Sequence, residues 1–197
     1  MSIAAIILAA GLSTRMGGNK LLEDIGGKPM LRRVAETALA SHARPILVVV
    51  GNEREAACCV LAGLDLQTVE NTAYREGLGA SIRAGVAAVP ESCEGALILL
   101  GDMPRVPMSL IDRIIETWRS VGACAICVAA HCGQRGHPVL FGRPYFPDLL
   151  ALSGDVGARR VIARNQARVR DVEAGNDAPL ADIDTPEALA EFRATLA

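Results

Sequence analysis

A glycine and two basic side chains follow the first apolar run of the chain. Residues 8–20 read LAAGLSTRMGGNK, and Gly11 lies where the backbone can turn tightly and approach an anion. Consecutive backbone N–H groups in such a loop form an anion nest, to which Arg15 and Lys20 add two cations. The segment therefore indicates a phosphate-binding loop. The alternative is a glycine-rich connection with solvated Arg15 and Lys20, but the segment is long for a mere connection.

This loop matches neither of two common phosphate-binding motifs. The dinucleotide pattern GxGxxG is absent, which argues against a nicotinamide or flavin enzyme. In a Walker A loop, Ser or Thr follows the lysine and binds magnesium. Here Leu21 follows Lys20, and five residues separate Gly11 from Gly17. A GTPase or kinase of the Walker type is therefore excluded.

Two aspartates are candidate metal ligands. Asp102 lies two residues after an apolar run at 96–100, between Gly101 and Met103, and Asp184 precedes a Thr-Pro helix start. A carboxylate at a strand end can hold Mg²⁺, which prefers oxygen ligands. The alternatives are that Asp102 caps a turn and that Asp184 supports the cap of the last helix.

Three further segments contain glycine next to polar side chains. Residues 71–81 contain Asn71, Gly77 and Ser81 before a predicted helix, whose N-terminus can face an anion or a base edge, although a plain cap is the alternative. Arg135 and His137 flank a glycine, as in the pocket of an anionic acceptor, although a lone histidine is most often structural. Residues 152–159 read LSGDVGAR, a turn into a helix where Gly157 and Arg159 can receive a phosphate.

Length and composition exclude several classes of protein. The 197 residues correspond to one domain, 1–197, with a core of ordinary size. A net charge of −2 and 3% aromatic residues argue against a nucleic-acid-binding protein. No apolar run approaches about 20 residues, and no basic region precedes residues 3–10, so we expect neither a membrane span nor a signal peptide. The expected location is the cytoplasm.

The six cysteines are interpreted as small apolar residues in a reducing compartment. Cys124 and Cys127, with His131 and Cys132 nearby, raise the alternative of a metal site. However, residues 123–130 form a continuous apolar run of strand length. Side chains three apart in a strand point to opposite faces, so Cys124 and Cys127 are not expected to share a metal.

Apolar runs of strand length alternate with helical patterns along the whole chain. Continuous apolar runs are typical of parallel strands that are covered on both faces, and we predict a three-layer α/β/α sandwich around a mostly parallel, Rossmann-like sheet. In such sheets ligands bind at the carboxyl ends of the strands, where the segments described above begin. The predicted strands are 3–8, 45–50, 96–100, 123–130 and 138–141 with a weaker one at 66–70, and the predicted helices are 29–41, 79–89, 107–121, 157–164 and 186–196.

The motifs resemble, in order, those of the nucleotidyltransferases with a MobA-like fold, of the nucleotide-diphospho-sugar transferase type. Residues 8–20 match the family pattern LAxGxSxRMG followed by Lys, and Gly-Asp-Met-Pro at 101–104 is typical of its molybdenum cofactor cytidylyltransferases. The segments 71–81, 136–141, 154–159 and 182–186 match further motifs of that group. The resemblance extends from residue 8 to residue 189.

The resemblance implies a role for each candidate residue. Arg15, Lys20 and Asp102 are the expected catalytic residues, and Asp102 and Asp184 the expected ligands of Mg²⁺. The expected acceptor-binding residues are Arg135, His137, Gly157 and Arg159. The nucleotide is expected to lie over Leu8, Ala9, Ala10, Gly11, Ser13, Arg15, Lys20, Asn71, Gly77 and Ser81.

The implied reaction in molybdenum cofactor biosynthesis is transfer of CMP from CTP to the terminal phosphate of molybdopterin carrying molybdenum, with release of pyrophosphate. A molybdenum hydroxylase is a possible recipient of the product. CTP is favoured because residues 9–11 read AAG where guanylyltransferases read AGG, and the Ala10 methyl would crowd a purine. The alternatives are a guanylyltransferase acting on molybdopterin, a transferase for a sugar or polyol phosphate, and a non-catalytic molybdopterin carrier. Loss of Lys20, Arg15 or Asp102 would indicate a carrier, and all three residues are present.

Overall fold

The apolar runs of the chain form the strands of one sheet. In the computed structural model, which describes residues 2–11 and 19–195, this sheet has seven strands in the order β3-β2-β1-β4-β6-β5-β7. Strand β6 is antiparallel to both of its neighbours, and the other paired strands are parallel. The strands are β1 (Ser2–Ala9), β2 (Ile46–Val50), β3 (Gln67–Glu70), β4 (Cys93–Leu100), β5 (Ile126–His131), β6 (Gln134–Gly142) and β7 (Val169–Glu173).

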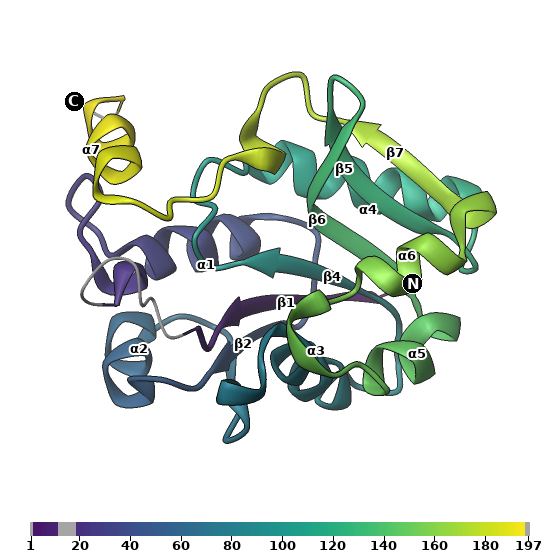
Figure 1. Cartoon of the computed structure of the whole chain (residues 1–197), viewed down its shortest axis with the longest axis horizontal. Helices are drawn as coiled ribbons and strands as arrows, with labels where there is room; N and C mark the ends of the chain where they lie inside the picture. Colours follow the sequence, from purple (N-terminus) through teal and green to yellow (C-terminus); the bar gives the residue numbers. More distant parts are fainter. Residues whose placement is uncertain (1, 12–18, 196–197) are drawn as a thin grey trace.

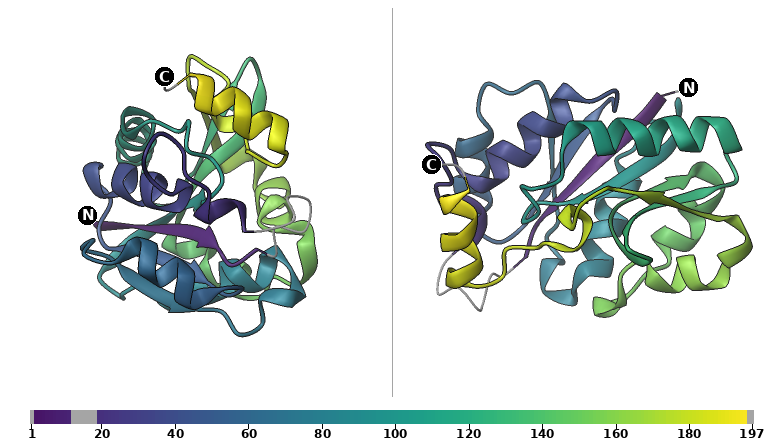
Figure 2. Two further views of the ribbon diagram at one scale, coloured as in Figure 1. Left: turned by 90° about the vertical axis from the view of Figure 1, so that its left-hand side faces the viewer. Right: turned by 90° about the horizontal axis from the view of Figure 1, so that it is seen from above.

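Helices cover both faces of the sheet (Figures 1 and 2). One layer contains α1, α2, α4 and α7, and the other contains α3, α5 and α6. The three-layer α/β/α sandwich predicted from the sequence is therefore confirmed. The bounds of the helices are α1 (Met30–Ala40), α2 (Arg54–Leu61), α3 (Leu78–Ala87), α4 (Met108–Val121), α5 (Phe146–Leu150), α6 (Arg159–Arg164) and α7 (Pro186–Ala194).

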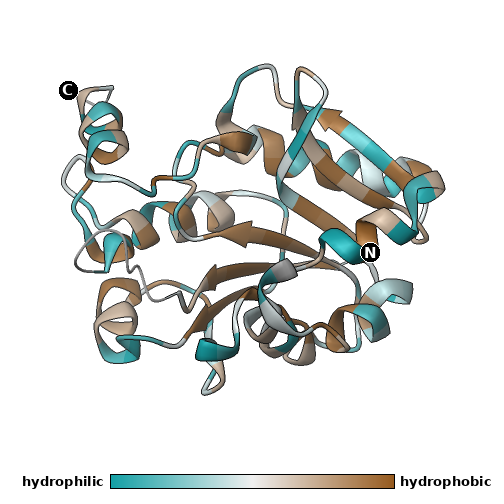
Figure 3. Ribbon diagram, in the orientation of Figure 1, coloured by the Kyte–Doolittle hydropathy of each residue, from teal (hydrophilic) through white to brown (hydrophobic). Residues whose placement is uncertain are grey.

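Strand β1 lies in the middle of the sheet and has apolar side chains on both faces. Ile3 and Ile7 pack under the layer of α1 and α4, whereas Ile6 and Leu8 pack under that of α3. Because successive side chains of a strand point to opposite faces, an unbroken apolar run supplies two cores at once. The central strands are accordingly the most hydrophobic ribbons in Figure 3.

Several boundaries differ from those predicted. Strand β6 begins four residues earlier than expected, because His131 pairs with Gln134 across a tight hairpin that extends both strands with polar residues. The run expected as a strand from residue 123 becomes β5 only at Ile126. The weak strand at 66–70 is present as β3, but β7 and α2 were not predicted. Both are amphipathic and partly exposed, so they lack the continuous apolar signal of the central strands.

The cysteines differ from their expected burial. All six are free thiols; Cys93 and Cys127 are buried, but Cys124 precedes β5 and is exposed. Burial raises the pKa of the Cys127 thiol to about 11, so this side chain behaves as an apolar residue near neutral pH. The argument that placed Cys124 in a strand is therefore wrong.

Within the described residues, no helix has both the length and the apolar character needed to cross a lipid bilayer.

Candidate active site

The register of β1 against β4 brings two predicted segments together. Leu8 pairs with Leu100, so the loop after β1 and the residues after β4 leave the sheet side by side. The Gly101 N–H donates to the Leu8 carbonyl at 3.0 Å. A Cβ at Gly101 would lie 3.1 Å from that same oxygen, which explains why glycine precedes Asp102. Both strands end at the side of the molecule where α7 lies (Figure 1).

The segment before α7 brings Asp184 to the same place. The Ile183 N–H donates to the Asp102 backbone carbonyl at 3.0 Å, and the Ile183 side chain is buried in the core. The N-cap of α7 is Thr185, whose hydroxyl accepts from the Ala188 N–H at 3.2 Å. Because Thr185 supplies the cap, the carboxylate of Asp184 is not needed for it.

Lys20 lies between the two carboxylates. It opens a short 3₁₀ helix, Lys20–Leu22, capped by the Asn19 side chain, which accepts from the Leu21 N–H at 3.2 Å. The Lys20 ammonium donates to Asp102 Oδ2 at 2.7 Å and also to Asp184 Oδ1. Only 11% of the Lys20 side chain is exposed. Burial by itself lowers the pKa of Lys20, but the two carboxylates outweigh burial and raise it above its ordinary value.

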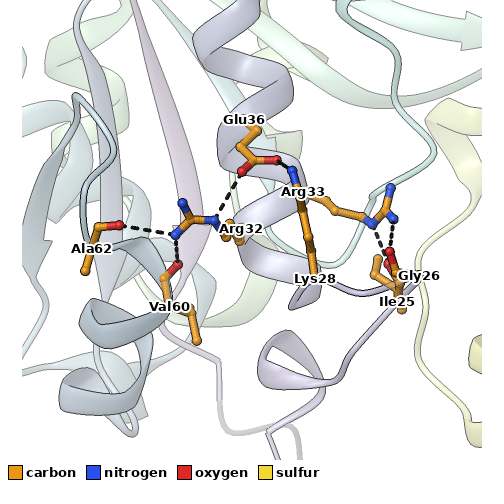
Figure 4. A network of polar contacts seen from close by, with 8 residues as sticks. All are labelled: Ile25, Gly26, Lys28, Arg32, Arg33, Glu36, Val60 and Ala62. Carbon is orange, nitrogen blue, oxygen red and sulfur yellow. Dashed lines mark hydrogen bonds and ion pairs between the residues drawn. The ribbon is translucent and has the colours of Figure 1, made fainter.

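A network of polar contacts holds the segment that follows Lys20 (Figure 4). Arg33 donates to the Ile25 carbonyl and, at 2.8 Å, to the Gly26 carbonyl, so the turn before α1 is tied to the helix. The exposed Lys28 pairs with Glu36 at 2.7 Å. Arg32 joins Glu36 to the carbonyls of Val60 and Ala62 near the end of α2. The turn at residues 25–28 is thus tied to α1, and α1 in turn is tied to the end of α2.

Only part of the predicted phosphate loop falls within the described residues. Leu8, Ala9 and Ala10 are buried and Gly11 is exposed, whereas Ser13 and Arg15 lie outside the described residues.

The Ala10 methyl packs in the core beneath α3, close to Gly51 and 2% exposed. The Ala10 methyl therefore does not project into an open pocket. It can influence a bound base only through the position of the adjoining backbone.

Asn71 and Ser81 brace each other. Both are buried, and the Asn71 amide donates to the Ser81 hydroxyl at 3.1 Å. The Asn71 carbonyl oxygen accepts from the Ala73 N–H at 3.0 Å, so both ends of the amide are in use. These contacts fix the turn between β3 and α3. Gly77 in that turn has a φ of 101°, and a Cβ there would lie 2.1 Å from the carboxylate of Asp155.

The predicted acceptor residues share a pocket of about 560 Å³. Its apolar lining comes from strands β1, β4, β5 and β6 and from α3 and α6, and it includes Leu8, Leu100 and Met103, the last of which directly follows Asp102. Arg135, His137, Gly157 and Arg159 all line it. Gly157 lies just before α6 and not within it, because that helix starts at Arg159, two residues later than predicted.

The charged groups of this pocket differ in their freedom to bind a ligand. The Arg135 guanidinium donates to both carboxylate oxygens of Asp171, at 2.6 and 3.3 Å, and to Gln166 at 2.8 Å. Arg159 is exposed and makes no ion pair within residues 2–11 and 19–195. Arg159 is therefore better placed than Arg135 to meet an anion.

His137 is a neutral group near pH 7. Burial lowers its pKa and Arg159 lowers it further, against opposing effects of the Ile98 backbone and Asp102. Its Nδ1 is buried and has no hydrogen-bond partner among the described residues. An uncharged ring suits a hydrogen bond to an acceptor substrate better than the binding of its phosphate.

Sequence reasoning missed three residues at this edge. Gly51 directly follows β2, and a Cβ there would lie 2.9 Å from the Ala10 Cβ and 2.8 Å from that of Tyr74. Asp155 and Asp182 line the pocket. Asp155 and Asp182 both lie within recognised motifs. Gly51 could have been found because it is a glycine at the carboxyl end of a buried strand.

The carboxylate cluster fits a magnesium ion. Asp102 and Asp184 converge on one cation, and Asp102 Oδ1 is buried with no hydrogen-bond partner among the described residues. Those residues contain no group of three or more His, Cys, Asp or Glu side chains that could enclose a metal. Mg²⁺ typically binds one or two carboxylates together with substrate phosphates, so an incomplete protein site is the expected form.

Comparison with known proteins places the chain among nucleotidyltransferases. The model of the MobA-like NTP transferase domain matches residues 5–169. The purine catabolism protein PucB of Bacillus subtilis is 29% identical, with 94% of this chain and 93% of that protein covered. Nicotine blue oxidoreductase of Paenarthrobacter nicotinovorans is 27% identical with the same coverage. The structure of Rv0371c from Mycobacterium tuberculosis in complex with manganese has a TM-score of 0.81 and 25% identity, covering 99% of this chain and 100% of that one.

Proposed function

The chain belongs to the MobA-like NTP transferase family and is a nucleotidyltransferase; we propose that it transfers CMP from CTP to the terminal phosphate of molybdopterin carrying molybdenum. The observation that carries this proposal is the convergence of Lys20, Asp102 and Asp184. Met103 and Asp182, their neighbours in sequence, line the acceptor pocket. A cation-binding centre then adjoins a largely apolar pocket that is large enough for a fused-ring substrate. The product is molybdopterin cytosine dinucleotide, and a molybdenum hydroxylase is the proposed recipient.

The proposed reaction is an in-line displacement. An oxygen of the acceptor's terminal phosphate forms a bond to the α-phosphorus of CTP. The bond from that phosphorus to the oxygen bridging to the β-phosphate breaks, and pyrophosphate leaves with the electron pair. The attacking phosphate is already an anion near neutral pH, so no general base is required.

The residues of the chain act by positioning and by charge. Asp102 and Asp184 would hold Mg²⁺, which, when bound, neutralises triphosphate charge. Lys20 and Arg15 stabilise charge on the α-phosphate and on pyrophosphate. The backbone of Leu8, Ala9, Ala10 and Gly11 supports the nucleotide, with Ser13 and the braced turn containing Asn71, Gly77 and Ser81. His137, Arg159, Arg135 and Gly157 bind the acceptor.

Calorimetry with Mg²⁺ tests the donor, and pyrophosphate release with purified molybdopterin tests the acceptor. We expect CTP to bind more tightly than GTP and pyrophosphate to appear only when molybdopterin is added. Tighter binding of GTP would make the chain a guanylyltransferase. Release of pyrophosphate with a sugar or polyol phosphate, but not with molybdopterin, would show that the acceptor is that phosphate and not molybdopterin. Acceptor binding without pyrophosphate release would indicate a carrier.

His137→Ala and Arg159→Ala are expected to raise the KM for molybdopterin about tenfold, because each removes a polar contact worth roughly 1.5 kcal/mol. The affinity for CTP, measured by calorimetry without acceptor, should stay within about twofold. Arg160→Ala is the matched control, because Arg160 is also exposed on α6. A tenfold loss of CTP affinity in either variant would indicate that the substituted residue contacts the nucleotide and not the acceptor.

A further inference from the structure

Lys20 occupies the position at which the two carboxylates would hold a metal ion. Its ammonium contacts one oxygen of Asp102 and one of Asp184, and the exposed fractions of the Lys20, Asp102 and Asp184 side chains are 11%, 20% and 34%. These three side chains carry one positive and two negative charges. A divalent cation at the same point would stand against the ammonium, and two cations in direct contact repel each other.

We propose that Lys20 is the resident counter-ion of Asp102 and Asp184, and that a triphosphate must draw it away before a divalent cation binds there. This proposal rests on the proposed function, in which these carboxylates hold the metal. Metal binding at the cluster is then conditional on the nucleotide, and neither ligand alone completes the site.

The structure gives Lys20 the means to exchange partners. Its backbone is fixed by the Asn19 cap and by the buried Leu21, so the 3₁₀ helix need not move. The four-carbon side chain of lysine can rotate about this anchor, and its ammonium is a compact charge without directional demands. A triphosphate entering beside Gly11 offers new oxygens for the ammonium. Once the ammonium has moved, Asp102 Oδ1, which has no hydrogen-bond partner among the described residues, is available for a metal.

The alternative orders of binding are electrostatically worse. With Lys20 absent and no metal bound, Asp102 and Asp184 would repel each other and the triphosphate. With Lys20 in place, metal binding must first break two ion pairs that are partly shielded from water. Lys20 therefore offsets the charge of the carboxylates and disfavours binding of a metal in the absence of the nucleotide. Because coupling between two ligands is reciprocal, the metal should equally tighten binding of the nucleotide.

The experiment measures Mn²⁺ binding by electron paramagnetic resonance in the absence of nucleotide. We expect weak binding to the wild type and binding about tenfold tighter to Lys20→Met, because the carboxylates lose their competitor. Lys20→Arg keeps a cation and should show no gain. Lys28→Met is the matched control, because Lys28 is the only other lysine and is exposed. Equal or weaker Mn²⁺ affinity of Lys20→Met would overturn the proposal.

Two further measurements, one with CTP present and one on Asp102→Asn, separate the proposal of the metal site from the proposal that Lys20 competes for it. CTP should raise the Mn²⁺ affinity of the wild type about tenfold and that of Lys20→Met much less. Asp102→Asn in the Lys20→Met background should abolish the gain. If Asp102→Asn removes Mn²⁺ binding while wild type and Lys20→Met bind it equally, the proposed metal site is supported and the proposed role of Lys20 is contradicted. If Asp102→Asn has no effect in any variant, the metal site itself falls, and this inference with it.

A measurement on the unaltered chain covers the case in which Lys20→Met does not fold. With two lysines in the sequence, protein labelled with ¹⁵N at the lysine ammonium gives two side-chain signals, and Lys28→Met assigns them. We expect Mg²⁺ alone to leave the Lys20 signal in place, and CTP with Mg²⁺ to shift it. A shift of equal size with Mg²⁺ alone would contradict the proposal.

Discussion

Asp102→Asn is expected to lower kcat/KM at least about 100-fold. The substitution keeps the size of the side chain but removes one of the two negative charges in contact with the Lys20 ammonium and one of two proposed ligands of Mg²⁺. Loss of one key electrostatic group in an enzyme site typically costs about 3 kcal/mol in the transition state. Asparagine can still accept a hydrogen bond from Lys20, and the backbone carbonyl that receives the Ile183 N–H is unchanged. We therefore expect the fold to be retained.

Turnover at saturating Mg²⁺, followed by pyrophosphate release, is the measurement for this variant. Asp65→Asn makes the same change of charge on an exposed aspartate and should leave activity unaltered. Circular dichroism checks that both variants are folded. Near-normal turnover of Asp102→Asn would remove this residue from the catalytic centre.

Gly136→Ala is expected to destabilise the chain by about 1–3 kcal/mol, in the range of overpacked sites. A Cβ at this position would lie 1.9 Å from the Pro179 carbonyl oxygen, which belongs to backbone and cannot rotate away. Strand β6 or the turn that contains Pro179 must therefore shift. Because Gly136 and Pro179 both line the acceptor pocket, the KM for the acceptor should rise together with the loss of stability.

Thermal unfolding and acceptor kinetics test this prediction together. For a chain of this length, the expected loss corresponds to a fall in Tm of roughly 2–4 °C for each kcal/mol. Gln134→Ala, two residues earlier on β6 and exposed, is the control and should leave both quantities close to wild type. A Gly136→Ala variant with unchanged Tm would show that the turn containing Pro179 yields at little cost.

The parts of the fold that were predictable carry a clear apolar pattern, either from burial on both faces of a strand or from one buried face of a helix. Strands β1, β2 and β4 contain unbroken apolar runs, and α4 has an apolar stripe ending at Trp118. Strand β7 reads VRDVE, at the edge of the sheet, and buries only Val169 and Val172. Its charged residues face outward, so its sequence carries no comparable signal. The direction of β6 was equally unreadable, because direction is set by the hairpin that precedes it.

The candidate site was predictable as a set of residues but not as an arrangement. Lys20, Asp102 and Asp184 each stood in a recognisable motif, yet nothing in those motifs places the ammonium between the carboxylates. Their meeting depends on the pairing of Leu8 with Leu100 and on the bond from Ile183 to the Asp102 carbonyl. Contacts of such long sequence separation have no local signature. The ion pair between Arg135 and Asp171 of β7 could not be predicted from the sequence for the same reason.

The reversed direction of β6 also keeps the proposed acceptor residues apart in sequence from the proposed nucleotide residues. Because β6 opposes its neighbours, its amino end carries Gly136 and His137 to the edge where β1 and β4 finish. The residues proposed for the acceptor therefore all come from 134–159, after α4, whereas those proposed for the nucleotide come from 8–81. A chimera of two family members joined between α4 and β5 would take the proposed nucleotide residues from one parent and the proposed acceptor residues from the other, while Leu8, Leu100 and Met103 of the pocket lining would come with the first parent. Recombination at this single junction offers a route by which the family could change acceptors while keeping its nucleotide.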